Sequence, residues 1–126
     1  MNLVDSSGWL EYFADGPNAS RFAEAIEDVD SLLVSTINVY EVFKKVLVQR
    51  GEDAALQAVA LLQQGTVIEL SSSIALNAAK FSHDQGIPMA DSIIYITARH
   101  HHATIWTQDA DFEGLDNVRY FVYRTE

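Results

Sequence analysis

Four acidic residues, Asp5, Glu41, Asp91 and Asp109, lie close after short apolar segments or turns that are far apart in the sequence. In a parallel α/β sheet, the carboxyl ends of the strands share one edge, where ligands bind. Carboxylates at that edge would converge on one pocket, and oxygen ligands of this kind hold hard cations such as Mg²⁺ or Mn²⁺. The spacing therefore predicts a divalent metal site built from acids.

Each acid also has an ordinary structural explanation. Asp5 is a suitable N-cap for a helix, and Glu41 is spaced four residues from Lys45, which suits a helical ion pair. Asp91 is expected in a first helical turn, where the helix dipole favours an acid, and Asp109 suits a turn. Four unpaired acids at one sheet edge would nevertheless repel one another and have raised pKa values, a penalty that a divalent cation removes.

Alternating strands and helices are predicted to position these acids. The strands are expected at residues 2–4, 32–35, 66–70, 104–107 and 119–123. The helices are expected at residues 9–13, 20–28, 37–50, 53–64, 74–85 and 90–102, with Thr36 as N-cap and Gly51 as the end of the third. This alternation without hairpin signals indicates an α/β sandwich with a mainly parallel sheet.

The composition is that of one globular domain covering residues 1–126, since 48% of the residues are apolar. The chain has no cysteine, which excludes disulfides and thiolate metal ligands and fits an intracellular location. The first ten residues lack the basic region of a signal peptide, and no apolar run approaches the roughly 18 residues of a membrane span. We therefore expect a cytoplasmic protein with no membrane partner.

The net charge of −10 argues against a nucleic-acid partner when taken alone. Proteins that bind polyanions usually present a basic surface that releases counterions. Cations bound in the acidic pocket and a few well-placed Lys and Arg side chains would weaken this objection without removing it.

The segments around the four acids resemble those of the PIN-domain nucleases, in particular the VapC-type toxins of prokaryotic toxin–antitoxin pairs. The resemblance covers essentially the whole chain, and the order and spacing of its motifs match the family pattern. The matching segments are VDSS at 4–7, STINVYEV at 35–42, IPMADSII at 87–94 and TQDADF at 107–112.

The resemblance implies a three-layer sandwich whose parallel sheet of about five strands has the order 3-2-1-4-5. It implies a Mg²⁺-dependent endoribonuclease whose acidic quartet is Asp5, Glu41, Asp91 and Asp109. A cognate antitoxin protein, a homodimer and an RNA substrate are implied in the same way. Asp111 is similar to a frequent fifth acid of the family, and three further positions match residues that support the site: Ser7, Asn38 and Thr107.

The residue types fit metal-assisted hydrolysis, because a bound cation lowers the pKa of water and needs no nucleophilic side chain. Glu41 could be a ligand or could orient the water, and the sequence leaves both roles open. Candidates for positioning phosphates are the basic residues on the helices of Glu41 and Asp91, although each also suits a solvated surface. These residues are Lys44, Lys45, Arg50 and Arg99.

Two other functions remain open. A receiver-type signalling domain is also an α/β fold with an acidic metal pocket, but it needs a phospho-accepting Asp after its third strand and a Lys after a late strand. Here the third predicted strand is followed by serines, beginning at Ser71. A PIN fold kept as a catalytically silent binding module is the second alternative, and the net charge is the observation that favours it.

Overall fold

The computed structural model describes residues 1–125. Its five strands form a single sheet in the order β3-β2-β1-β4-β5, and every neighbouring pair is parallel. The predicted fold class and strand order are therefore confirmed. The strands are β1 (Asn2–Val4), β2 (Leu32–Ser35), β3 (Thr66–Ile68), β4 (Thr104–Thr107) and β5 (Val118–Tyr120).

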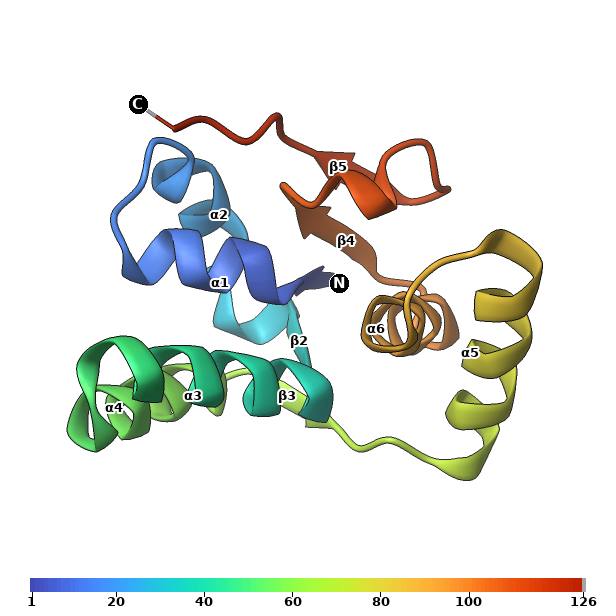
Figure 1. Ribbon diagram of the computed structural model, residues 1–126, viewed down its shortest axis with the longest axis horizontal. Helices are drawn as coiled ribbons and strands as arrows, with labels where there is room; N and C mark the ends of the chain where they lie inside the picture. The colour runs from blue at the N-terminus through green and yellow to red at the C-terminus, as the bar shows by residue number, and fades with distance from the viewer. Residues whose placement is uncertain (126) are drawn as a thin grey trace.

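Helices cover both faces of the sheet. Figure 1 shows α1 to α4 on one side of the strands and the pair α5 and α6 on the other, which makes three layers. Two short 3₁₀ turns, η1 (Val29–Ser31) and η2 (Ala110–Phe112), complete the elements. The helices are α1 (Ser6–Phe13), α2 (Ala19–Ile26), α3 (Thr36–Arg50), α4 (Glu52–Leu62), α5 (Ser72–Gln85) and α6 (Met89–His100).

Two hydrophobic cores result from the period of two along each strand. On β1, Leu3 packs in the cluster that includes α5 and α6, while Val4 packs in the cluster that includes α1 to α4. Ile105 and Trp106 on β4 divide in the same way. Because both faces of the sheet are covered, the central strands β1, β2 and β4 carry buried apolar residues at consecutive positions, which is why each is recognised as a short apolar run.

Several predicted boundaries were wrong by a few residues. The third strand ends at Ile68 instead of residue 70, and Leu70 is 42% exposed beyond the sheet. The fifth strand covers Val118–Tyr120 instead of 119–123. The last helix ends at His100 instead of 102, because His102 has a left-handed backbone with φ 54°, which a helix cannot contain.

The helix starts depend on which polar residue caps them. Helix α3 is capped by Ser35 and not by Thr36: Ser35 Oγ accepts a hydrogen bond from the Ile37 amide at 3.1 Å. The side chain of Asn38 accepts in return from the Ser35 amide at 3.0 Å. Ser35 is the N-cap because its backbone is still extended at the end of β2, as the N-cap position requires. Gly51 ends this helix as predicted.

Other helices start earlier than predicted. Helix α1 begins at Ser6 instead of residue 9, because Asp5 caps it. Helix α5 begins at Ser72 instead of 74, because Ser71 caps it. Two more predicted ranges, 20–28 and 53–64, shift to Ala19–Ile26 and Glu52–Leu62. Within residues 1–125, the structure contains no helix that is both long enough and apolar enough to span a bilayer.

Candidate metal centre

Asp5 stands at the carboxyl end of the central strand and is only 2% exposed. Its carboxylate accepts hydrogen bonds from Ser7 Oγ at 2.7 Å and from the Gly8 amide at 3.2 Å, the latter as N-cap of α1. Gly8 allows α1 to pack closely on β1, because a Cβ there would lie 2.6 Å from Val4 Cγ1. Burial raises the pKa of Asp5 to about 7 despite these donors.

Three more acids meet beside it. Carboxylate oxygens of Asp91, Asp109 and Asp111 lie within 4.8 Å of one another. Asp91 comes from the first turn of α6, while Asp109 follows β4 and caps η2 by accepting from the Asp111 amide at 2.9 Å. The strand ends thus bring together residues that are more than a hundred positions apart in the sequence.

The electrostatics of this cluster are unfavourable without a cation. The pKa of Asp91 is raised to about 8, mainly by burial and then by the charge of Asp109, a hydrogen bond with Asp111 and the charge of Asp5. None of these four acids forms an ion pair within residues 1–125. Oxygen-only donors, crowded like charges and the lack of a balancing Lys or Arg suit a hard divalent cation. The residues present therefore fit the metal that the sequence predicts.

Glu41 does not belong to this close group of oxygens. Its Oε1 accepts a hydrogen bond of 2.7 Å from Ser6 Oγ, and Ser6 Oγ accepts in turn from the side-chain Nδ2 of the buried Asn38 at 3.1 Å. The first turns of α1 and α3 are joined by this chain. The structure therefore brings Asn38 beside Glu41, whereas no hydrogen bond within residues 1–125 joins Glu41 to Asp5.

Thr107, the last residue of β4, connects Asp109 with Ser7, the hydroxyl donor to Asp5. Its Oγ1 accepts from the Asp109 amide at 2.9 Å and lies 3.5 Å from Ser7 Oγ. Ser7 Oγ also accepts from the Gln108 amide at 3.3 Å while donating to Asp5. Two hydroxyls thus fix the chain that leads from β4 into Asp109.

Comparison with known proteins decides the family. The model of the PIN domain family matches residues 3–118. The chain belongs to the PIN domain family. No curated protein matches it in sequence.

Solved structures share the fold of this PIN domain. A toxin–antitoxin complex from Klebsiella pneumoniae is 22% identical with a TM-score of 0.79, covering 94% of this chain and 96% of that one. VapC20 of Mycobacterium tuberculosis, described as a sarcin–ricin loop cleaving toxin, is 15% identical with a TM-score of 0.78, covering 94% and 97%. FitAcB from Neisseria gonorrhoeae is 23% identical with a TM-score of 0.60, covering 96% and 97%.

Within residues 1–125, only Lys44 and Lys45 of the four candidate basic residues of the PIN domain line hollows that also contain predicted site residues. Lys45 shares a hollow of about 350 Å³ with Ser7 and Asp109, and it also shares a second one of about 360 Å³ with Glu41. Lys44 lines the second hollow and stacks over the ring of Tyr40, 5.7 Å from its centroid. No ion pair joins Glu41 to Lys45 in the described part of the chain, so the helical pair considered from the sequence does not form.

The other two basic residues lie away from the acids. Arg50 is nine residues beyond Glu41, about 13 Å further along α3. Arg99 is eight residues beyond Asp91, about 12 Å along α6, where its guanidinium lies over the ring of Tyr95, 5.1 Å from the centroid. The geometry brings Lys44 and Lys45 to the site but not these two.

Sequence reasoning missed a group of buried polar residues next to the metal centre of this PIN domain. Glu11, Asn18 and Gln108 are buried and hydrogen-bonded to one another. An acid within the apolar stretch between Trp9 and Phe13 was the available signal, since Glu is rarely buried without partners. Ser6 was also missed, although it follows Asp5 directly.

Proposed function

We propose that this PIN domain is an endoribonuclease that depends on Mg²⁺, with Mn²⁺ as a substitute, and that it is the toxin of a toxin–antitoxin pair. One observation carries the proposal: the oxygens of Asp91, Asp109 and Asp111 converge within 4.8 Å beside the buried Asp5. Such a cluster is costly to maintain in a folded protein unless a cation uses it.

The residues that would hold the cation are Asp5, Asp91, Asp109 and Asp111. A bound divalent cation supplies a water of lowered pKa and positive charge that balances a phosphodiester under attack. The chain holds these acids in place before any ligand arrives, through Ser7 on Asp5 and through Thr107 on the Asp109 backbone. Preorganisation of this kind removes the cost of ordering the groups when substrate binds.

Glu41 is assigned to the water or to a second cation position, because its carboxylate is bonded to Ser6 and does not belong to the close group of Asp91, Asp109 and Asp111. The exposed Lys45 borders both the hollow that Ser7 and Asp109 line and the hollow that Glu41 lines, and Lys44 borders the second of these. These two ammonium groups are proposed to position phosphates of a single-stranded RNA, which offsets the net charge of −10 locally.

The biological assignment draws on the structural relatives. The Klebsiella pneumoniae relative is a toxin–antitoxin complex, and VapC20 is described as cleaving the sarcin–ricin loop, which supports an RNA substrate and a cognate antitoxin here. A homodimer in the cytoplasm is part of the same proposal. Exposed apolar side chains on α3, with Tyr40 at 62% and Val48 at 78%, are compatible with a protein interface on this helix.

The test is cleavage of a labelled single-stranded RNA by wild-type protein, by Asp5→Asn and by Asp28→Asn. Asn is as good an N-cap as Asp, so Asp5→Asn preserves α1 while removing a charge from the site. Asp28 is exposed and makes no capping bond, which makes Asp28→Asn the matched control. We expect cleavage with Mg²⁺ by wild type and control, and none with EDTA or by Asp5→Asn.

Cleavage that survives both EDTA and Asp5→Asn would overturn the metal-nuclease proposal. The second candidate, a silent binding module, is favoured by the net charge of −10. It predicts that wild-type protein binds RNA or a partner but leaves the labelled RNA intact at every Mg²⁺ concentration.

A further inference from the structure

A second cluster of buried polar groups lies one turn of α1 away from the metal centre. Glu11 is 7% exposed, Asn18 is 1% exposed and Gln108 is 8% exposed. They come from α1, from the start of α2 and from the loop after β4. The nuclease mechanism uses none of them, yet all three side chains are buried.

Their hydrogen bonds form a closed ring. Glu11 Oε2 accepts from the Asn18 amide at 2.7 Å, and Glu11 Oε1 accepts from Gln108 Nε2 at 3.3 Å. Asn18 Nδ2 closes the ring by donating to Gln108 Oε1 at 2.9 Å. The second hydrogen of the Asn18 side-chain Nδ2 is donated to the Val122 carbonyl at 2.9 Å. Both polar atoms of the Gln108 side chain are therefore hydrogen-bonded within the ring.

Burying the polar side chains of this ring costs free energy, which indicates that the ring has a function. The Glu11 carboxyl group has no ion-pair partner within residues 1–125, so neutral donors alone offset its burial. The chain also leaves room for it: a Cβ at Gly16 would collide with the Glu11 carboxyl group. An apolar side chain at position 11 would bury at lower cost, so the fold alone does not require this acid.

Gln108 is the link between the ring and the site. It stands between Thr107, the last residue of β4, and Asp109. Its amide donates to Ser7 Oγ, and the next amide, that of Asp109, donates to Thr107 Oγ1. With its side chain held in the ring, Gln108 cannot rotate without breaking these contacts. The backbone from which the Asp109 carboxylate projects is thereby held in place, and the carboxylate itself accepts from the Asp111 amide.

We propose that Glu11, Asn18 and Gln108 are positioning residues, which hold Asp109 in the orientation that binds the divalent cation. This inference rests on the proposed function for its use of the cation. Partners that orient a ligand without touching the metal typically change metal affinity by about tenfold or more when removed.

The test compares Gln108→Met with Leu62→Val. Methionine keeps the length of glutamine but can make neither hydrogen bond of the ring. Leu62 is fully buried at the opposite edge of the sheet, where its carbonyl accepts from the Gly65 amide just before β3. Leu62→Val is thus a matched control for a small loss of stability. Mn²⁺ affinity is measured by calorimetry, and amide hydrogen exchange is measured residue by residue.

We expect Gln108→Met to weaken Mn²⁺ binding about tenfold and to speed exchange of the Asp109 and Asp111 amides. Leu62→Val should lower the melting temperature but leave both quantities at wild-type values. Equal Mn²⁺ affinity and equal exchange at positions 109 and 111 in Gln108→Met and wild type would overturn the proposal.

The two proposals fail in different ways. If wild-type protein binds no Mn²⁺, the proposed function fails, and exchange of the Asp109 and Asp111 amides still decides whether the ring holds this loop. Gly16→Ala provides an independent variant, because it displaces the Glu11 carboxyl group without altering any member of the ring. It should reproduce the faster exchange at positions 109 and 111, and unchanged exchange would count against the ring.

Discussion

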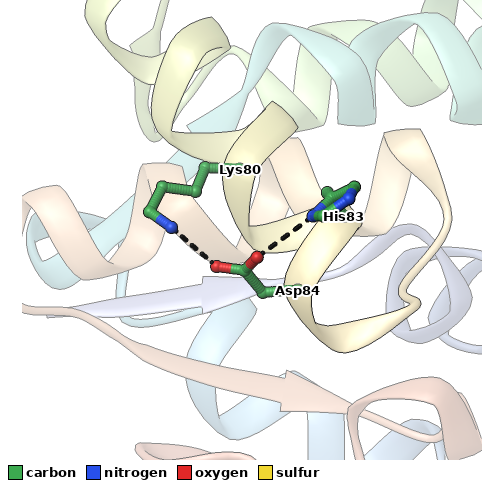
Figure 2. A network of polar contacts seen from close by, with 3 residues as sticks. All are labelled: Lys80, His83 and Asp84. Atoms are coloured by element: carbon green, nitrogen blue, oxygen red, sulfur yellow. Dashed lines mark hydrogen bonds and ion pairs between the residues drawn. The ribbon is translucent and has the colours of Figure 1, made fainter.

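Two aspartates seven residues apart, Asp84 and Asp91, are held in opposite ways. Asp84 lies on the exposed surface of α5, where Lys80 Nζ donates to it at 2.9 Å and His83 Nδ1 lies 3.1 Å away (Figure 2). The hydrogen bond from Lys80 is the main reason that the pKa of Asp84 is lowered. Asp91 has acids for neighbours, and burial is the main reason that its pKa rises to about 8.

The difference identifies the group that needs a ligand. Asp84 has its cation within its own helix, so its charge is balanced whether or not anything binds. Asp91 has no ion-pair partner in residues 1–125, so a cation from outside the chain has to balance its negative charge. Chemical identity and proximity in sequence do not separate the two residues; only the surroundings that the fold provides do so.

The largest expected effect is on RNA cleavage. Asp91→Asn should lower kcat/KM by at least about a hundredfold, because one ligand for the cation is lost. Asp84→Asn removes the same charge from the surface and should leave kcat/KM unchanged. The measurement is the initial rate of RNA cleavage at several substrate concentrations with saturating Mg²⁺. Equal losses in both variants would show that net charge, and not the site, controls activity.

The second effect is on stability without metal. The folded-state pKa values of Asp5 and Asp91, about 7 and about 8, lie above the ordinary value of 3.8. The folded state therefore binds more protons than the unfolded state between about pH 4 and pH 8, so the free energy of unfolding falls as pH rises through this window. In EDTA, the melting temperature should drop by at least about 5 °C between about pH 5.5 and about pH 8.5.

Two variants sharpen this prediction, with melting followed by circular dichroism. Asp91→Asn should reduce the drop and stabilise the metal-free protein at the higher pH. Asp84→Asn should keep the full drop, because the pKa of Asp84 is shifted downward from 3.8 and its titration lies below the window. Added Mn²⁺ should restore the melting temperature of wild type, and a pH-independent melting temperature in EDTA would contradict the raised pKa values.

The smallest effect concerns the balanced acid. Lys80→Met removes the main partner of Asp84, yet both side chains are largely exposed, so the melting temperature should change by no more than about 1 °C. The change should vanish in about 1 M salt, which screens surface charges. A larger loss would mean that the ion pair on α5 stabilises the fold more than its exposure indicates.

The sequence was sufficient for those features that depend on short-range patterns. The continuous apolar runs ending at Val4 and Thr107 marked buried parallel strands, and an acid close after each run marked the edge where ligands bind. The strand order came from the family resemblance. The boundaries were less predictable, since Ser35 and Thr36 are both good N-caps and only the backbone at the end of β2 selects between them.

The details of the site depend on contacts that local patterns do not encode. The family resemblance implied Glu41 as a member of the quartet and Asp111 as a fifth acid. In the structure Asp111 joins Asp91 and Asp109 in the close group of oxygens, while the role of Glu41 stays a prediction. Which acid joins that group depends on the η2 turn, whose geometry is determined by the fold of residues 109–112. The ring of Glu11, Asn18 and Gln108 was invisible for the same reason, because it joins positions about ninety residues apart.

The hydrogen bond from Asn18 to the Val122 carbonyl bears on how this protein can be shortened for laboratory use. The family match ends at residue 118, and an expression boundary chosen there would remove that carbonyl. It would also remove Phe121, whose ring packs edge-to-face on Phe22 at 5.4 Å between centroids. The red segment that runs past α2 in Figure 1 therefore belongs to the folded unit, and affinity tags at this end need a spacer beyond it.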